Sequence, residues 1–394
     1  MPDFAFRLPP IGDLTFTQQI ALDEPRPLLV TGGPGSGKTV VSIFRFLNEI
    51  VQTRNALFFT YNRTLMSSIR GTLRQRANVL LPQLNSHEVD RIARNQIGSI
   101  YEWYARNCDG RLSEDDEEAI SEKFLRYTED RFNALYNELI VDEAQDLRPA
   151  IINNFYKLSE KVSCGADRSQ DIQGHYSEPA DDVIFRILNA HRETLRQGLT
   201  QNFRNTKQIF SFARNFVPGD LNVQNINLED LPEGDEPDIN LNLSEVDQLN
   251  RIVEIVRQNP ASNIGIIAHI PSHVRRIRDH FISNGYSAAS DASEETSFSY
   301  YCGDMPKPDR VAMEDRLRTP FILTYDTCKG LEFDIVILPF IETANWALPR
   351  TRKSDNGIDK PMITPNHYYV AATRPRSQLY VLGSRMPGIL SFIE

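Results

Sequence analysis

The stretch GGPGSGKT, residues 32–39, combines the residue types that bind a chain of phosphates. It fits the spacing G-x-x-x-x-G-K-[ST], in which glycines let backbone N–H groups turn toward phosphate oxygens and the following helix adds its positive dipole end. Lys38 is expected to reach the β- and γ-phosphates, and the Thr39 hydroxyl to hold Mg²⁺. The sequence therefore predicts a site for ATP and Mg²⁺. The loop residues predicted to bind the nucleotide are Gly32, Gly33, Gly35, Ser36, Gly37, Lys38 and Thr39.

Two adjacent acids follow an apolar run in LIVDEAQD, residues 139–146. Asp142 is suited to act as a direct or water-mediated ligand of Mg²⁺. Glu143, one residue on, is suited to orient and deprotonate an attacking water. Adjacent acids in a solvated surface loop are the alternative. The apolar residues before them and the phosphate loop earlier in the chain favour the catalytic interpretation.

Short apolar strands alternate with helical patterns, as in a parallel sheet covered by helices on both faces. Two series of such strands indicate two α/β domains in tandem, with a boundary near residue 198, giving domains 1–198 and 199–394. The predicted strands are 27–32, 55–61, 138–144, 161–167, 239–243, 264–270, 321–325, 335–340 and 379–384. The phosphate loop and the acid pair would both follow strands of the first domain.

Composition narrows the class of protein. The chain has 394 residues, too many for a typical single domain, and its 24% charged residues are ordinary for a globular protein. No apolar run approaches the roughly 20 residues of a membrane span, so no membrane association is expected. The four cysteines are scattered, which favours a reducing, cytoplasmic setting. The net charge of −10 argues against coating nucleic acid by bulk electrostatics, although it allows a local basic groove.

Further motifs follow in a fixed order along the chain, and together they resemble the UvrD/Rep/PcrA-like superfamily 1 DNA helicases. GGPGSGKT and VDEAQD resemble motifs I and II of that family. The other similar segments are LTFTQQIAL (Q motif), FFTYNRTL (Ia), IGSIYEWYA (Ib), CGADRSQDI (III), LTQNFRN (IV), TYDTCKGLEFDIVILP (V) and YYVAATRPRSQLYV (VI). The resemblance covers residues 14–381, nearly the whole chain.

The resemblance implies two tandem RecA-like domains with the nucleotide in the cleft between them. It places Gln18 at the adenine edge and makes Gln170 the sensor of the γ-phosphate. Phe203 would stack on adenine, and Arg204 and Arg374 would bind the γ-phosphate, since the planar guanidinium meets phosphate oxygens in pairs. Gly330 and Glu332 would lie near the nucleotide.

The resemblance also implies contacts to a single strand. The residues expected to make them are Phe59, Tyr61, Asn62, Arg63, Tyr101, His175 and Tyr176. Core packing is an equal alternative for Trp103, which belongs to the same Ib-like segment. On a predicted helix over 63–76, Leu65, Ile69 and Leu73 would face the core and leave Arg63, Arg70, Arg74 and Arg76 largely free; an ordinary solvated face is the alternative for the last two.

This chain departs from the family pattern in several places. Gln173 and His175 stand in motif III where relatives have tyrosine and tryptophan, which puts base stacking in doubt; an unliganded loop is the alternative for His175 and Tyr176. Motif V has Asp326 where a histidine is common, and motif VI has Pro375 after its arginine. The accessory insertions are reduced to about 107–136 and 285–320. We therefore expect ATP hydrolysis and tracking along a single strand rather than vigorous unwinding of a duplex.

Two functions fit these residues. One is an ATP-dependent translocase or helicase on single-stranded nucleic acid, DNA before RNA, with the family's 3′-to-5′ direction. The other is a nucleic-acid-sensing ATPase switch in a repair or anti-phage defence complex, with little unwinding of its own. A protein partner would then supply nuclease or duplex-handling function. A P-loop kinase would leave motifs IV to VI unexplained.

Overall fold

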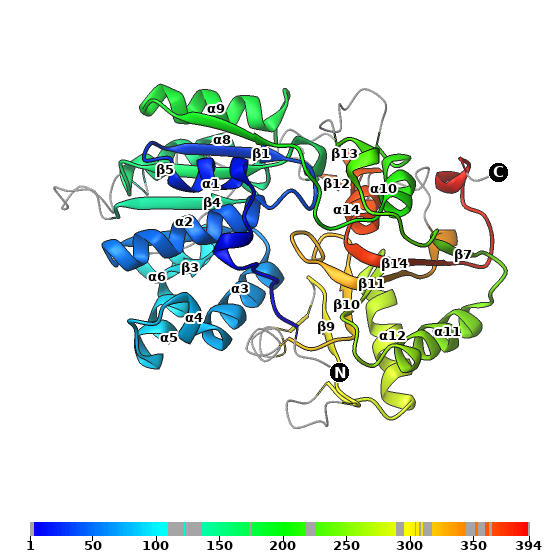
Figure 1. The fold of residues 1–394 in the computed structure, drawn as a ribbon. Coiled ribbons are helices and arrows are strands. Elements are labelled where there is room, and N and C mark those ends of the chain that lie inside the picture. The colour runs from blue at the N-terminus through cyan, green and yellow to red at the C-terminus, as the bar shows by residue number, and fades with distance from the viewer. Residues whose placement is uncertain are drawn as a thin grey trace. The chain divides into compact units, whose positions relative to one another are not determined.

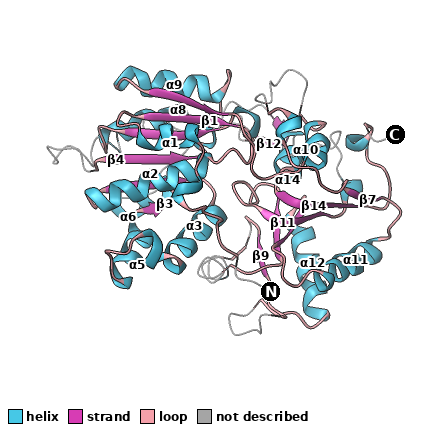
Figure 2. Cartoon of the chain, in the orientation of Figure 1, coloured by secondary structure: helices cyan, strands magenta, loops and turns pink. Residues whose placement is uncertain are grey.

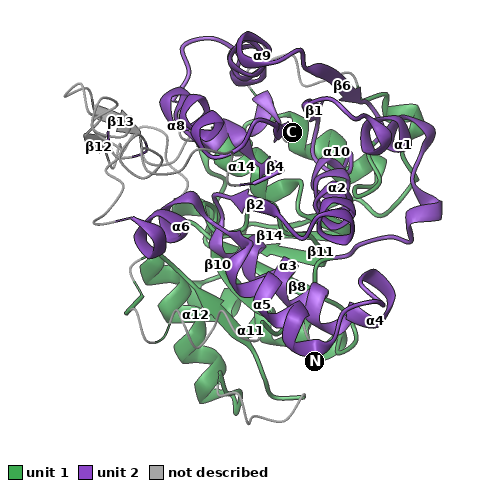
Figure 3. Cartoon of the chain, turned by 90° about the vertical axis from the view of Figure 1, so that its left-hand side faces the viewer, with its two compact units in different colours: residues 1–6, 202–394 green, residues 7–201 purple. Residues whose placement is uncertain are grey.

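A computed structural model describes residues 4–108, 122, 124, 136–172, 175–217, 226–288, 295–303, 305–306, 309, 317–343, 351–353, 359–361 and 365–392. The chain divides into two compact units, drawn in different colours in Figure 3. Residues 7–201 form the P-loop unit, and residues 1–6 with 202–394 form the C-terminal unit. This division differs from the predicted domains 1–198 and 199–394 in two ways. The boundary falls after residue 201, and the first six residues belong with the second unit.

The P-loop unit is built on a six-stranded sheet in which every pairing is parallel. The strand order is β3-β2-β4-β5-β1-β6. Its strands are β1 (Leu28–Gly32), β2 (Ala56–Thr60), β3 (Ile97–Gly98), β4 (Glu138–Asp142), β5 (Val162–Ala166) and β6 (Leu195–Leu199). Because β4, β5 and β1 are neighbours, the loops after these strands meet at one edge of the sheet, where α/β folds bind ligands.

Helices flank this sheet (Figures 1 and 2). They are α1 (Phe16–Asp23), α2 (Lys38–Gln52), α3 (Arg63–Gln75), α4 (Ala77–Leu80), α5 (Ser86–Asn95), α6 (Ile100–Asn107), α8 (Pro149–Asn154) and α9 (Ala180–His191). α1 begins at a capping box in which Thr15 and Gln18 satisfy each other's backbone N–H groups. On α3, Leu65, Ile69 and Leu73 are buried, as their spacing predicts.

The C-terminal unit contains a second six-stranded sheet, again with parallel pairings only, in the order β7-β14-β11-β8-β10-β9. Its strands are β7 (Asp238–Asn240), β8 (Ile264–Ala268), β9 (Ser299–Tyr301), β10 (Phe321–Thr324), β11 (Phe333–Leu338) and β14 (Pro375–Leu382). A separate antiparallel pair joins β12 (Thr351–Lys353) to β13 (Asp359–Pro361). The helices of this unit are α10 (Lys207–Arg214), α11 (Glu245–Gln258), α12 (Pro271–Ser283) and α14 (Pro365–Ala372).

The start of the chain belongs to this second unit through a backbone hydrogen bond and ring contacts. The Phe4 N–H donates to the Leu317 carbonyl at 2.9 Å. The Phe4 ring stacks on Phe333 and meets Phe321 edge-on, with centroid distances of 5.0 and 5.8 Å. The sequence of this short N-terminal segment gives no sign of which sheet Phe4 will pack against.

The α/β fold class is confirmed, and each of the nine predicted strands has a counterpart. β3 and β9 were not predicted because runs of two and three residues carry no periodicity. β6 was not predicted because it is a polar edge strand, LRQGL. The predicted insertion at 107–136 lies almost entirely outside the described residues, as does part of 285–320. Among the helices described, none combines the length and apolar character needed to cross a lipid bilayer.

Candidate nucleotide site

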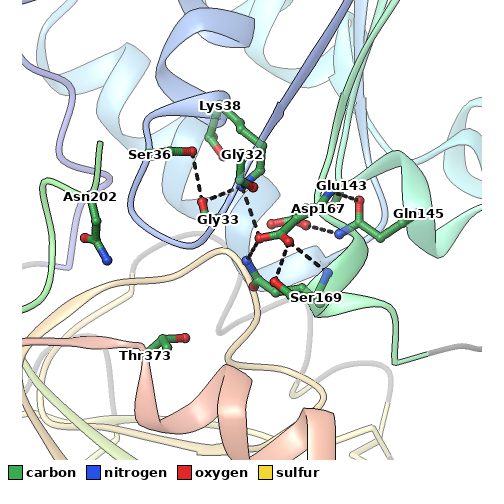
Figure 4. Close-up of polar contacts among 12 residues, drawn as sticks. Gly32, Gly33, Ser36, Lys38, Glu143, Gln145, Asp167, Ser169, Asn202 and Thr373 are labelled. Carbon is green, nitrogen blue, oxygen red and sulfur yellow. Dashed lines mark hydrogen bonds and ion pairs between the residues drawn. The ribbon is translucent and has the colours of Figure 1, made fainter. Parts of the chain in front are cut away.

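The phosphate loop connects β1 to α2 through backbone that glycine favours. Gly35 and Gly37 have φ of 71° and 90°, in the left-handed region where other residues are strained. At Gly32, an added Cβ would come within 2.7 Å of the Leu199 carbonyl and 2.5 Å of the Ser36 hydroxyl. The Ser36 hydroxyl donates to the Gly33 carbonyl at 2.9 Å (Figure 4). These positions therefore need glycine to form the loop.

Lys38, the first residue of α2, is buried, with 6% of its surface exposed. Its ammonium donates to the carbonyls of Gly32 and Gly33 at 2.7 and 2.9 Å. The third contact is to Asp167 Oδ2 at 3.3 Å, beyond the end of β5 (Figure 4). The lysine is therefore fixed at the loop by two carbonyls and one carboxylate.

Asp142 ends β4 and lies next to α2. Its Oδ2 accepts a hydrogen bond from the Thr39 hydroxyl at 2.8 Å, so the two predicted Mg²⁺ ligands are brought together. Within the described residues its Oδ1 is buried without a hydrogen-bond partner. Gly165 on β5 leaves room there, because a Cβ would come within 2.9 Å of that oxygen. The contact and the orphaned oxygen together mark a place for a cation.

The electrostatics of Asp142 agree with that assignment. Burial, and next the charge of Glu143, raises the pKa of the Asp142 carboxyl to about 7. A divalent cation beside Oδ1 would give this oxygen a partner and offset the negative charge of Asp142 and Glu143. The residues present therefore fit Mg²⁺, which Thr39 and Asp142 would hold.

Glu143 has a left-handed backbone, with φ of 56°, before a short 3-10 turn over Ala144–Asp146. This conformation is uncommon outside glycine and asparagine, and strain of this kind clusters at functional sites. Glu143 is 5% exposed, and its Oε2 accepts from Gln145 Nε2 at 2.6 Å. The predicted base is therefore buried and oriented by an amide.

Gln145 and Asp167 join the acid pair to the phosphate loop (Figure 4). Gln145 Oε1 accepts from the Asp167 N–H at 3.2 Å, while Asp167 Oδ2 contacts Lys38. Asp167 also receives the Ser169 N–H and hydroxyl on Oδ1, and Gln170 Nε2 on Oδ2 at 2.6 Å. A continuous polar chain thus runs from Glu143 through Gln145 and Asp167 to Lys38, with the predicted sensor Gln170 attached.

Sequence reasoning did not single out Gln145 and Asp167, although both are completely buried. The signal was present, because each stands within three residues of the end of an apolar strand and within three residues of one that was assigned a role. Polar residues at the carboxyl ends of adjacent parallel strands face one another, and their burial requires partners. Strand order, which the sequence did not specify, was the missing information.

Gln18 lies against the phosphate loop. It is 5% exposed, and its Nε2 donates to the Ser36 carbonyl at 3.1 Å. A Cβ at Gly37 would collide with this amide, so the glycine and the glutamine fit together. The role of Gln18 at an adenine edge stays a prediction.

In the C-terminal unit, the motif IV, V and VI residues meet one another. Arg204 Nε is 3.3 Å from Glu332 Oε2, and its Nη1 donates to the Thr373 carbonyl at 3.3 Å. The neighbouring Asn205 Nδ2 donates to the carbonyls of Thr373 and Pro375 at 3.2 and 2.6 Å. Predicted residues from three segments far apart in the sequence therefore form one polar cluster.

Arg374 is 1% exposed, and its guanidinium is fixed by its own unit. It donates to the Val370 and Leu331 carbonyls at 2.7 and 3.3 Å and to the Thr373 hydroxyl at 3.1 Å. Gly330 has a left-handed φ of 76°, whereas Phe203 is 49% exposed. The phosphate roles of Arg204 and Arg374 and the stacking role of Phe203 stay predictions.

The residues predicted to contact a strand are placed in different environments. Tyr61 and Tyr101 meet edge-on with centroids 6.2 Å apart, at the carboxyl ends of β2 and β3. Phe59 is 2% exposed and packs on Trp103 and Phe155 in the core, which argues for packing at this position. Asn62 caps α3, since its Oδ1 accepts from the Thr64 N–H at 3.0 Å.

Tyr176 and the α3 arginines are engaged in contacts within the P-loop unit. The Tyr176 hydroxyl donates to the Leu147 carbonyl at 2.6 Å, and burial raises its pKa well above the usual value. The expectation that the α3 arginines are largely free is wrong for three of them: Arg70 pairs with Glu102, Arg74 pairs with Asp90, and Arg76 donates to the Leu8 carbonyl. Arg63 and His175 are partly buried.

Comparison with known proteins agrees with the phosphate loop. Residues 22–173 match the family model described as AAA domain, which is less than half of the chain. No curated protein matches the sequence. The loop geometry and this match together define a P-loop ATPase domain of AAA type.

Two solved helicase structures are among those similar to the chain. The C-terminal domain of a possible DNA helicase from Lactobacillus plantarum WCFS1 is 15% identical, with 49% of this chain and 94% of that chain covered and a TM-score of 0.33. The helicase nonstructural protein 10 of an arterivirus is 13% identical, with 93% and 61% covered and a TM-score of 0.37. Similarity at these TM-scores carries no argument about function. The arrangement of two parallel sheets fits tandem RecA-like domains.

Proposed function

We propose that this protein is an ATP-dependent motor of UvrD/Rep type, a superfamily 1 translocase or helicase that tracks single-stranded DNA in the 3′-to-5′ direction. The observation that carries the proposal is the polar chain from Glu143 to Lys38, which links the predicted base to the phosphate loop. The cluster that unites motifs IV, V and VI in the C-terminal unit supports it.

The chemistry of ATP hydrolysis follows from the P-loop unit. Lys38 and the loop N–H groups would bind the phosphates, and Glu143 would take the proton of the attacking water. Bound Mg²⁺, held by Thr39 and Asp142, would neutralise charge on the β- and γ-oxygens. Gln170 and Lys38 both donate to Asp167 Oδ2, so a change at the γ-phosphate would alter the contacts of both side chains. Arg204 and Arg374 would contribute further positive charge at the phosphate.

Single-strand contact is proposed for the carboxyl ends of β2 and β3, where Tyr61 and Tyr101 meet. Aromatic rings at such a position stack on bases of any sequence. DNA is proposed before RNA on the family resemblance alone. A protein partner is proposed to supply nuclease or duplex-handling function, and the cytoplasm is the proposed compartment.

Stimulation of ATP hydrolysis by oligonucleotides of increasing length tests the proposal. A translocase that dissociates at strand ends gives turnover that rises with length before levelling off, whereas a sensing switch reaches its plateau at the site size. Comparing DNA and RNA oligonucleotides of the same sequence shows which nucleic acid stimulates hydrolysis. Labels at the 3′ or the 5′ end of the strand show the direction of translocation. Tyr61→Ala is expected to weaken stimulation with basal turnover retained. No stimulation by any strand would refute the proposal and leave an ATPase of another kind.

A further inference from the structure

A cavity with several polar lining residues lies in the P-loop unit, away from the phosphate loop. It has a volume of about 400 Å³. Its polar lining comes from the residues after α2, from α5 and from α6. Arg106 on α6 donates to the Arg94 carbonyl on α5 at 2.7 Å. Figure 1 labels these three helices. Lys38 begins α2 and Arg54 follows its end, so a helix of 15 residues, about 22 Å long, separates the two sites.

Three arginines line this cavity: Arg54, Arg91 and Arg106. No acidic residue is among the described residues that line it. Arg54 and Arg91 have exposed side chains that form no ion pair with any described residue, while Arg106 shares Glu102 with Arg70 at 3.3 and 3.4 Å. Among the described residues, the lining therefore carries more positive charge than the acids that pair with it, on a protein whose net charge is −10.

The backbone at Arg54 indicates that its position matters. Its φ of 60° lies in the left-handed region, where glycine or asparagine is favoured after a helix. The residue is fixed on both sides, because its N–H donates to Ile50 and its carbonyl accepts from Gln96 at 2.9 Å. Because this backbone favours glycine or asparagine over arginine, the residue type points to a role for the guanidinium.

The other residues that line the cavity indicate which class of anion it fits. Trp103 is 3% exposed, and its Nε1 donates to the Tyr136 hydroxyl at 3.2 Å. The Trp103 ring is therefore buried and is not offered for stacking on a base. The Asn95 amide, which is exposed, and the guanidinium forks instead suit oxygen atoms. A concave space of this volume also matches small-molecule sites better than an extended chain.

We propose that this cavity binds a small polyphosphate anion, either free or as the phosphate chain of a nucleotide. Three guanidinium groups around a concave site match an anion with several charged oxygens. The proposal is independent of the motor function, because none of its residues belongs to the phosphate loop. Occupancy would tie the end of α2 to α5 and α6.

Trp103 fluorescence provides a local readout. The chain has two tryptophans, so Trp346→Phe leaves Trp103 as the sole indole. In this background, tripolyphosphate is expected to give a saturable change, weakened at least tenfold by Arg91→Gln and by Arg54→Gly. Because glycine suits the left-handed backbone, Arg54→Gly is expected to keep or raise the melting temperature, which separates binding from folding.

Two matched variants complete the experiment. Arg94→Gln removes an exposed arginine of α5 that pairs with Asp90 and does not line the cavity, and it should leave the response unchanged. Lys38→Ala should also leave it unchanged, since it acts at the other site. ATP compared with tripolyphosphate identifies whether the anion is part of a nucleotide. No saturable change, an equal loss in Arg94→Gln, a loss in Lys38→Ala, or a response only to single-stranded DNA or an acidic peptide would overturn the proposal.

Discussion

The ammonium of Lys38 and the carboxylate of Asp167 form a buried ion pair of 3.3 Å, with side-chain exposures of 7% and 0%. The two residues follow β1 and β5, which are neighbours in the sheet. Asp167 also holds Ser169 and Gln170, so one carboxylate joins the phosphate loop to the segment that resembles motif III. A direct ion pair therefore couples these two parts of the site.

Replacing Lys38 by alanine is expected to abolish ATP hydrolysis, because no other side chain in the loop can reach the β- and γ-phosphates with positive charge. Turnover should fall by about 1,000-fold or more, with the circular dichroism spectrum unchanged. Arg26→Ala, which removes an exposed surface ion pair of the same unit, is the control and should retain turnover. Undiminished hydrolysis by Lys38→Ala would remove the site assignment.

Replacing Asp167 by asparagine should lower saturated turnover about tenfold or more, because Gln170 and Lys38 lose a charged partner while Oδ1 can still accept from Ser169. A double-mutant cycle with Lys38→Ala, read from denaturant unfolding, should give a coupling of about 1–3 kcal/mol, as for buried neighbours. Asp13→Asn, at an exposed position, is the control. Additive effects on stability would show that the contact is incidental.

Replacing Arg374 by alanine is expected to cut turnover by about 100-fold or more while nucleotide affinity changes little, as for an arginine that stabilises the transition state. Because its guanidinium satisfies two carbonyls and a hydroxyl, the melting temperature should fall as well. Turnover is therefore compared well below that temperature. Arg276→Ala, which removes an exposed ion pair on α12 of the same unit, is the control. A loss of affinity with saturated turnover intact would refute the role.

The sequence predicted the parts of this molecule that local physics determines. The glycine loop at 32–37 and the apolar strands before Asp142 and Asp167 are set by nearest neighbours in the chain. Gln145 and Asp167 were missed because their partnership depends on β4 and β5 being adjacent. The α3 arginines were expected to be free because their partners, Glu102, Asp90 and Leu8, lie on other segments. The periodicity of apolar residues predicts one helix or strand, and it does not predict which other elements pack beside it.

His269, after β8, gives the protein a pH-dependent stability. It is 7% exposed and packed against Tyr325 and Tyr368, and its Nε2 is bonded to the Tyr368 hydroxyl. Burial, and next the charge of His273, lowers the pKa of His269 to about 3. Below about pH 6.5, His269 therefore binds a proton in the unfolded chain but stays neutral in the folded protein. The contribution of the neutral ring to the free energy of unfolding is full above that pH and is lost as the pH falls toward 3.

The expected effect is a loss of about 2 kcal/mol of unfolding free energy in the wild type between about pH 6.5 and pH 5, from one proton at about 1.4 kcal/mol per pH unit. His269→Gln removes the titrating ring, so the difference in stability between variant and wild type should narrow over this range. Denaturant unfolding at several pH values measures it, and His87→Gln, at an exposed site on α5, is the control. A wild-type-minus-variant difference that does not change with pH would mean that His269 accepts its proton in the folded protein, and that the packing around Tyr325 and Tyr368 tolerates the charge.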